Sequence, residues 1–156
     1  MQTFLLHSYD ELQDVYDSVT EDFNSVDYAD WLNNELDRLA DLHKGFFQAQ
    51  AGPDGAAWKN NAPATIKKKG HSRILRGHPK NNYRLSRSLM QKSHTSTGDA
   101  IREAINEGGG RAHLGFGTDV PYAVYNENRP HVGINEQHLQ GMVERVADHV
   151  VQQLAK

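Results

Sequence analysis

The sequence predicts an α+β fold: an antiparallel sheet packed by amphipathic helices, with a long basic loop between them. Apolar residues recur every three or four positions in three segments, which is typical of amphipathic helices. Apolar and polar residues alternate on both sides of the triple glycine at 108–110, as in a β-hairpin. A chain of 156 residues suits one domain and is short for two, so residues 1–156 are expected to form a single domain.

The first predicted helix covers residues 8–19. Ser8 and Glu11 stand at the spacing of a capping box, in which each side chain bonds a free backbone N–H of the first turn. An apolar stripe follows at helical intervals: Leu12, Val15, Tyr16 and Val19.

The second predicted helix covers residues 27–50. Ser25 or Asp27 can cap its N-terminus, because a side-chain oxygen there accepts a free backbone N–H. The sequence AGPDG at 51–55 ends the helix, and the face opposite its apolar stripe is acidic. The stripe consists of Trp31, Leu32, Leu36, Leu39, Leu42, Phe46 and Phe47.

A flexible loop or arm is predicted for residues 59–84, which are rich in glycine, proline, asparagine and lysine and show little periodicity. Within it, TIKKKG at 65–70 is basic enough to contact phosphates, and it equally fits a solvated loop. The segment that follows, residues 83–90, fits either a strand or a short helix.

A hairpin is predicted from residues 99–107 and 111–117. The first of these segments also fits a helix, because Ala100, Ile101, Ala104 and Ile105 recur at helical spacing. The intervening glycines favour a tight turn, so we expect two antiparallel strands.

The last third of the chain is expected to contain a corner and a helix. Thr118 or Asp119 can cap a short helical turn that begins at Pro121, because proline has no N–H to leave unpaired. Asn135 is a suitable N-cap for a helix over residues 136–154. Its amphipathic stripe is Leu139, Val143, Val146, Val150 and Leu154. Each predicted helix has one apolar stripe, so a sheet face or another subunit must cover it.

Composition excludes several classes of protein. The absence of cysteine rules out a disulfide scaffold, a thiol nucleophile and a cysteine-ligated metal. No basic segment precedes the short apolar patch near residue 5, and no run approaches the ~18 apolar residues of a membrane span, so we expect neither a secretion signal nor a membrane partner. A mean hydropathy of -0.74 is polar for a compact monomer and leaves room for arms or for surface covered in an assembly.

Charge is divided between two parts of the chain. Residues 9–54 carry twelve acidic residues against only Arg38 and Lys44, whereas residues 55–98 carry ten basic residues and no acidic one. Clustered like charge is costly unless it is solvated, screened or met by its opposite, so the split indicates charged partners. The expected partner-binding side chains are Lys67, Lys68, Lys69, Arg73, Arg76, Arg84 and Arg87.

No catalytic or metal-binding set can be read from the sequence. The nine histidines form neither HExxH nor another tight ligand set. Ser86 and Ser88 lack an elbow glycine pattern and an adjacent base, and no spacing brings Asp119 and Glu127 together. We therefore expect no catalytic residue, no metal and no cofactor, and interpret Trp58 as a packing anchor.

Four segments of the chain occur in the order found in a known family. Residues 46–70 read FFQAQAGPDGAAWKNNAPATIKKKG, with Pro-Asp-Gly-x-x-Trp followed by Pro-x-Thr-x-x-x-Lys. The segments RLSRSL at 84–89, LGFGTDVPYAVYNEN at 114–128 and RPHVGI at 129–134 follow. Together they resemble the phage virion morphogenesis family, the tail completion proteins typified by those of Mu-like phages.

The resemblance implies a small α+β protein without enzymatic activity that completes the phage tail or joins the tail to the head. It implies assembly in the bacterial host cytoplasm and a place in the virion of a phage or prophage. It also implies that GTDVPYA at 117–123 is a structural corner between a sheet and a helix. The signature residues with structural roles are Pro53, Gly55, Trp58, Gly117, Pro121, Tyr122, Arg129 and Pro130.

The partners implied are further copies of this chain in a ring, hexameric because the tail tube is six-fold, together with head-tail connector and tail-tube or terminator proteins. DNA in the tail lumen is a further candidate. The charge split itself predicts that the basic loop faces an acidic surface: the N-terminal helices of a neighbouring subunit, a connector protein or DNA in the tail lumen. The alternative function is a nucleic-acid-binding module that uses residues 59–92, and steep loss of affinity with salt would identify it.

Overall fold

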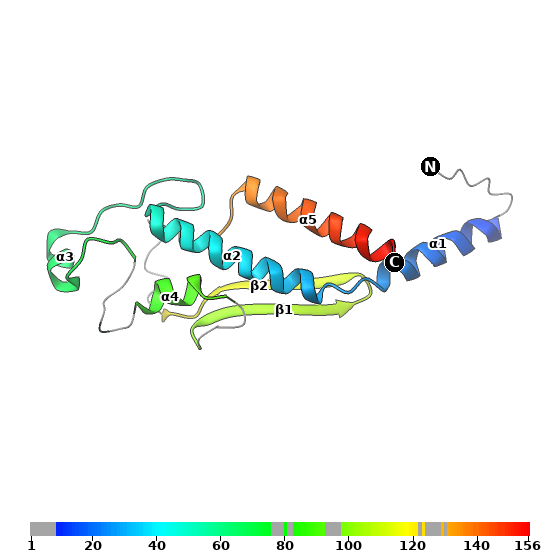
Figure 1. Cartoon of the computed structure of the whole chain (residues 1–156), viewed down its shortest axis with the longest axis horizontal. Coiled ribbons are helices and arrows are strands. Elements are labelled where there is room, and N and C mark those ends of the chain that lie inside the picture. Colours follow the sequence, from blue (N-terminus) through cyan, green and yellow to red (C-terminus); the bar gives the residue numbers. More distant parts are fainter. Residues whose placement is uncertain are drawn as a thin grey trace.

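The structure is a computed structural model that describes residues 9–75, 80, 83–92, 98–121, 123, 129 and 131–156. The described residues form five helices and a two-stranded antiparallel sheet (Figure 1). The fold is α+β with the sheet packed against helices, as the sequence predicts. The elements are α1 (Tyr9–Asn24), α2 (Ala29–Ala49), α3 (Pro63–Lys69), α4 (Arg84–Met90), β1 (Ala100–Gly108), β2 (Arg111–Thr118) and α5 (Glu136–Leu154).

The helix α2 is the centre of the fold. At its start, the Asp27 carboxylate accepts a hydrogen bond from the backbone N–H of Ala29 at 2.9 Å, which satisfies a donor of the first turn. At its end, Gln50 adopts a left-handed conformation, and its N–H bonds the carbonyl of Phe46. The buried face of α2 includes most of the predicted stripe: Leu32, Leu36, Leu39, Phe46 and Phe47.

The strands β1 and β2 form the predicted hairpin. Their antiparallel register runs from the pair Ala100 and Thr118 to the pair Gly108 and Arg111, with an irregularity after Asn106. The three glycines 108–110 all have positive φ, at 73°, 58° and 70°, a region that glycine enters without steric cost. The pairing with β2 shows that this part of the chain is a strand, so the helical alternative for residues 99–107 is wrong.

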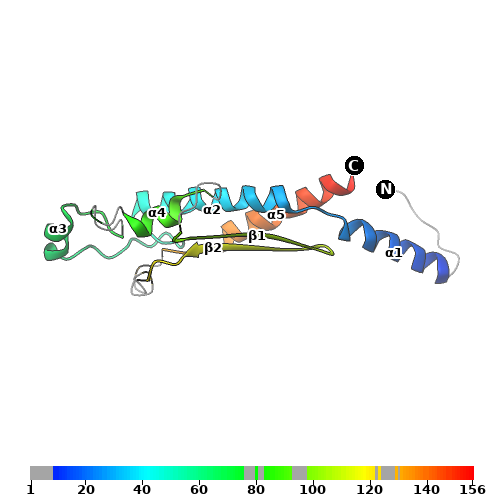
Figure 2. The same cartoon turned by 90° about the horizontal axis from the view of Figure 1, so that it is seen from below.

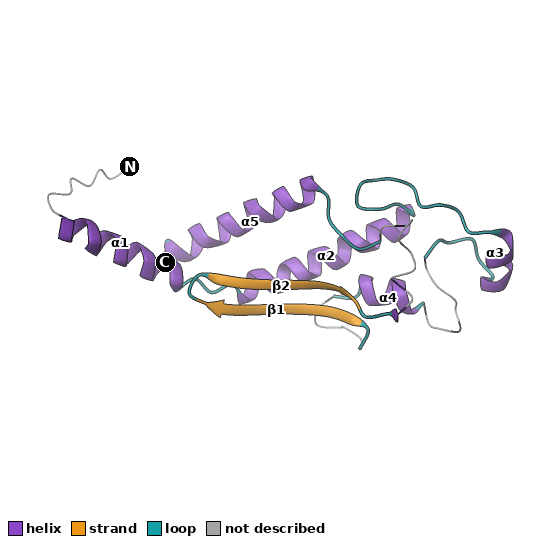
Figure 3. Cartoon of the chain, turned by 180° about the vertical axis from the view of Figure 1, so that it is seen from behind, coloured by secondary structure: helices purple, strands orange, loops and turns teal. Residues whose placement is uncertain are grey.

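The helices α2, α4 and α5 lie on one side of the sheet. In Figures 1 and 3, α2 runs along the hairpin, α4 lies beside its end, and α5 runs alongside α2. Phe116 and Leu114 of β2 face these helices and pack against the buried core. None of the described helices covers the other side of the hairpin (Figure 2), where Ile101 and Ile105 are 38% and 49% exposed.

Two hydrophobic clusters hold the elements together. The smaller joins the start of α2 to α5 and β2, because Val146, Val150 and Leu114 pack against the buried Val26 and Leu32. The larger joins the end of α2, the segment after it, α4 and the corner after β2. Its buried members are Phe46, Phe47, Trp58, Ile74, Leu75, Leu85, Leu89 and Val120.

The helix α5 is anchored at its start and only partly covered along its length. The side chain of Asn135 accepts a hydrogen bond from the His138 N–H at 2.9 Å, as its assignment as N-cap predicts. No residue of α5 is fully buried. Leu139, Val143 and Leu154 of its predicted stripe remain 51%, 52% and 40% exposed, so the stripe is covered only at Val146 and Val150.

The molecule is elongated. α1 projects from one end and α3 lies at the other, as both Figure 1 and Figure 2 show. The chain exposes 10598 Å² of surface, whereas a compact monomer of 17.5 kDa exposes about 7,900 Å². The polar composition is thus matched by a body with unusually large exposed surface.

Some expected boundaries were wrong. α1 continues to Asn24 instead of ending at residue 19, and its proposed cap Ser8 lies outside the described residues. Residues 63–69, expected as part of a loop, form the helix α3, because Pro63 suits a first helical turn and Gly70, with φ of 74°, ends it. Residues 83–90 adopt the helical alternative as α4.

Candidate partner-binding surface

The three lysines of the predicted partner-binding set lie on α3, at one tip of the molecule (Figure 1). Lys67 and Lys68 are exposed. Lys69 is half-buried, and its ammonium donates a hydrogen bond to the carbonyl of Arg73 at 3.1 Å. Burial, with a smaller contribution from the charge of Arg129, lowers the pKa of Lys69. Lys69 therefore closes the loop after α3, while Lys67 and Lys68 face solvent.

Side-chain hydrogen bonds fix the base of the segment that carries α3. The amide of Asn61 donates to the carbonyls of Ser72 and Arg73, at 3.1 and 3.2 Å, which brings the two ends of the segment together. The Ile74 N–H donates to the side-chain oxygen of Gln50 at 2.8 Å, and Ile74 itself is buried. The segment is thereby tied to the end of α2 and holds α3 outward.

The arginines of the predicted set have different surroundings. Arg73 and Arg87 are exposed, on the loop after α3 and on α4. Arg84 forms an ion pair with Asp99, and its hydrogen bonds lower the pKa of that carboxyl. Arg84 thus has an acidic partner within its own chain, which weakens the prediction that it serves another molecule. Arg76 lies outside the described residues.

Of the signature residues in the segment after α2, Trp58 belongs to the buried core, whereas Pro53 and Gly55 lie in the turn that precedes it. Trp58 is 4% exposed, and the edge of its ring meets Phe47 with centroids 5.3 Å apart. The backbone N–H of Trp58 donates to the carbonyl of Gln50 at 2.8 Å, so the chain folds back onto the end of α2. Pro53 and Gly55 occupy the intervening turn, in which Gly55 has a φ of 79°. The prediction that Trp58 is a packing anchor is confirmed.

The described signature residues of the later motifs lie at the end of β2 and in the segment that follows it. Gly117 is buried near the end of β2, and Pro121 begins a short helical turn after it. The Thr118 hydroxyl accepts a hydrogen bond from the Val120 N–H at 3.3 Å, but Val120 precedes the turn, so this bond is not the predicted cap. Arg129 donates a hydrogen bond to the carbonyl of Asn60 at 3.2 Å. Tyr122 and Pro130 lie outside the described residues.

No catalytic constellation was identified among the described residues. Within them, no three His, Cys, Asp or Glu side chains gather as metal ligands. The hydroxyl of Ser88 donates to the Leu85 carbonyl at 2.8 Å and bonds that of Thr118 at 2.7 Å, and Ser86 donates to the Tyr83 carbonyl. Both serines are buried, so their hydroxyls serve α4 and its contact with β2.

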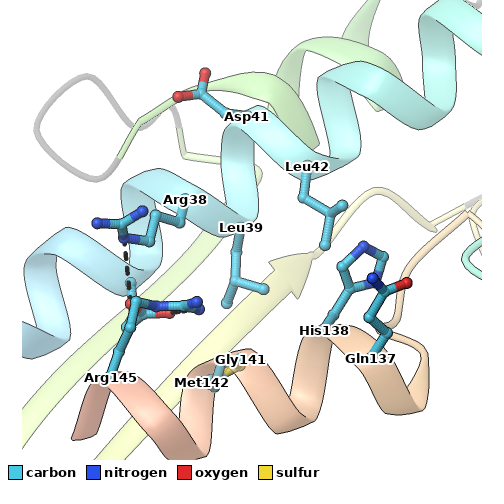
Figure 4. A pocket seen from close by; sticks show the side chains of 10 residues that line it. Arg38, Leu39, Asp41, Leu42, Gln137, His138, Gly141, Met142 and Arg145 are labelled. Carbon is cyan, nitrogen blue, oxygen red and sulfur yellow. Dashed lines mark hydrogen bonds and ion pairs between the residues drawn. The ribbon is translucent and has the colours of Figure 1, made fainter. Parts of the chain in front are cut away.

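Sequence reasoning missed an ionic contact between α2 and α5. Glu35 lies in the buried face of α2, and its carboxylate binds Arg145 of α5 and, at 3.3 Å, Arg38. A groove of about 550 Å³ runs between the two helices beside this contact. Figure 4 shows the two arginines at one end of the groove and His138 toward the other. An acidic residue inside an apolar stripe was the available signal, but its partner stands 110 positions further along the chain.

Arg102 was also missed. Its guanidinium lies over the Phe116 ring, 3.9 Å from the centroid. It donates hydrogen bonds to five carbonyl oxygens, which belong to Ser88, Leu89, Gln91, Ile101 and Gly117. Burial lowers the pKa of Arg102 to about 10. The carbonyls of the last turn of α4 have no partner within the helix, so Arg102 satisfies them from β1.

His43 is buried where α2 meets the segment before α5. Its Nδ1–H donates to the Leu39 carbonyl at 2.7 Å, and its Nε2 accepts from the Gly133 N–H at 3.3 Å. Both bonds require the neutral ring, protonated at Nδ1. The pKa of His43 is lowered to about 4, mainly by burial. The charges of Arg102, His131 and His138 contribute to this lowering, and the hydrogen bond to the Leu39 carbonyl opposes it.

The chain matches no protein-family model, no curated protein and no solved structure. None of the described helices has the length and apolar character needed to cross a membrane. The candidate site is a basic helix, α3, held at the tip of an elongated body.

Proposed function

We propose that this chain is a non-enzymatic virion assembly protein of a phage or prophage, which completes the tail or joins it to the head through oligomeric protein contacts. The observation that carries the proposal is the position of α3, whose exposed Lys67 and Lys68 lie at the tip of the molecule, while Trp58 lies in the hydrophobic core. A surface of this kind suits docking to an acidic partner, because opposite charges steer association and fix orientation.

The four family-like motifs support the proposal in a second way. Their described residues form a core, a turn and a corner, which are the roles expected of a scaffold. Assembly would take place in the host cytoplasm, and the protein would remain in the virion. Its partners would be further copies of itself in a ring, head-tail connector proteins and tail-tube or terminator proteins.

The test is a charge reversal in the phage or prophage that encodes the chain. Lys67, Lys68 and Lys69 are changed to Glu, and heads joined to tails are counted by electron microscopy. We expect joining to be lost while circular dichroism shows a folded protein. A control with the same change in net charge reverses three bases away from α3 (Lys44, Arg111 and Lys156) and should join normally. Normal joining by the folded α3 variant would refute the role of α3.

DNA binding is the second candidate, because Lys67, Lys68, Arg73 and Arg87 are all exposed within the predicted segment 59–92. If DNA is the partner, affinity for a duplex falls steeply between about 50 and 200 mM salt, since each phosphate contact releases counterions. Loss of joining in the α3 variant with unchanged DNA affinity would favour a protein partner.

A further inference from the structure

The helix α1 carries only acidic charge. Its 16 residues include no lysine, arginine or histidine. The described side chains of Asp14, Asp17 and Glu21 are exposed and recur at spacings of three and four, so they share one face of the helix. The full set of carboxylates in α1 is Asp10, Glu11, Asp14, Asp17, Glu21 and Asp22.

The opposite face of α1 is apolar and open. Tyr16, Val19 and Phe23 share it and are 64%, 48% and 47% exposed. α1 contacts the end of α5, and the backbone of Phe23 approaches the hairpin turn at Gly110 (Figure 1). A helix of this length is marginal in water unless another surface covers its apolar face.

The other end of the molecule has the opposite charge. Lys67, Lys68 and Arg73 are exposed there. The start of α5 lies near the middle of the molecule in Figures 1 and 2, with its N-terminal end directed toward α3, and the exposed Val132 and Ile134 precede it. α1 and α3 lie at opposite ends in both views, so these surfaces cannot meet within one copy.

We propose that a second copy of this chain covers α1: the helix of one copy docks on the α3 half of the next. Its acidic face meets Lys67, Lys68 and Arg73, and its apolar face turns toward Val132 and Ile134. The charges select the partner surface and its register. This contact deepens the proposed function and rests on it, since it names the neighbour that the basic helix meets.

Charge also decides the symmetry of the contact. Pairing α3 with α3 would bring lysines together, which is costly for exposed like charges. A contact between two different surfaces is heterologous: it repeats from copy to copy and produces a ring if the rotation closes. The contact should weaken with salt, because its charges are exposed and screened.

The experiment uses two full-length reversal variants and sedimentation velocity at low salt. The acid-reversed variant has Asp14, Asp17 and Glu21 changed to Lys, and the base-reversed variant has Lys67, Lys68 and Arg73 changed to Glu. Each variant alone places like charges at the contact, so we expect the Kd for self-association to rise at least about tenfold. An equimolar mixture restores opposite charges at every contact, so it should associate like the unchanged chain.

The sedimentation results distinguish the proposed contact between α1 and α3 from pairing through apolar faces. The mixture identifies the contact because neither variant can supply the correct charges alone. Undiminished self-association of the acid-reversed variant would indicate pairing of apolar faces and would overturn the proposal, as would a mixture that stays monomeric. This experiment uses purified protein, whereas the joining assay counts heads joined to tails. If the contact between copies is not found, the joining assay still tests the proposed function independently.

A disulfide trap detects a weak contact. The chain has no cysteine, so Ser18→Cys on the acidic face of α1 and Ala64→Cys on α3 introduce the only thiols. Oxidation of the double variant should give a ladder of covalent dimers, trimers and larger species. The two single-cysteine variants are the controls and should give dimers at most. Absence of a ladder at concentrations where the unchanged chain associates would contradict the contact.

Discussion

The guanidinium of Arg145 in α5 donates hydrogen bonds to both carboxylate oxygens of Glu35 in α2, at 2.6 and 2.7 Å. The Glu35 side chain is only 2% exposed. A carboxylate removed from water in this way depends on its partner for compensation. Because no residue of α5 is fully buried, the pair supplies much of the specificity with which α5 is placed on α2.

Arg145→Met should lower the free energy of unfolding by about 2–4 kcal/mol, because it leaves the Glu35 carboxylate buried with only Arg38 nearby. Urea denaturation measures the change. Arg38→Met is the matched control: the Arg38 side chain is 61% exposed, so the cost should stay below about 1 kcal/mol. Adding Glu35→Leu to Arg145→Met should regain stability, and a further loss would show that the charge itself is not the cause.

Arg102→Met should destabilise the fold by about 2–4 kcal/mol, since the carbonyls at the end of α4 lose a charged donor in a half-buried setting. Arg102→Lys should recover only part of this, because an ammonium cannot reach five carbonyls at once. Thermal unfolding followed by circular dichroism provides the measurement. Arg111→Met, at an exposed position of the same hairpin, should change stability by less than about 0.5 kcal/mol. Equal effects at both positions would contradict the role of Arg102.

Stability should fall as the pH drops from about 6.5 to about 4, the window set by the ordinary pKa of histidine and the lowered pKa of His43. In this window His43 is protonated in the unfolded chain and neutral in the folded chain, so lowering the pH favours unfolding. The His43 contribution is about 2–3 kcal/mol across the window. Comparing unfolding at pH 7 and pH 4.5, His43→Leu should show a smaller drop than the unchanged chain. His113→Gln, at an exposed site, should keep the full drop.

Trp58→Ala should cost about 3–5 kcal/mol, the usual effect of removing a buried large aromatic side chain. Its neighbour Lys59 is exposed, and Lys59→Ala serves as the control with little expected change. Denaturant unfolding measures the change in the free energy of unfolding. A loss below about 1 kcal/mol for Trp58→Ala would contradict the prediction, because it would mean that the core tolerates the absence of this side chain.

Periodicity in the sequence was sufficient for the long elements. The stripe from Leu32 to Phe47 and the alternation around the triple glycine each extend over enough residues to distinguish a helix from a strand. α3 escaped prediction because seven residues give fewer than two helical turns, and its lysines hide any apolar stripe. α1 continued to Asn24 because nothing in Glu21, Asp22 or Phe23 stops a helix.

The polar contacts could not be predicted in the same way. The pairing of Glu35 with Arg145, the carbonyl bonds of Arg102 and the placement of His43 against Gly133 all join elements that are distant along the chain. Each depends on how helices cross and which faces meet, which local patterns do not encode. The same limit applies to Arg84. Its ion pair with Asp99 could not be predicted from the sequence, and it makes Arg84 a weaker candidate for binding a partner.

Because α1 projects away from both hydrophobic clusters, this helix should unfold separately from the rest of the molecule and at a lower free-energy cost. The amides of α1 should exchange with deuterium through opening of that helix alone, whereas those in the middle of α2 should require unfolding of the whole chain. Heating should therefore melt part of the helical signal before the cooperative transition. A partner bound at α1 would slow exchange in this helix selectively, and deuterium uptake would reveal its footprint even while the rest of the chain behaves as before.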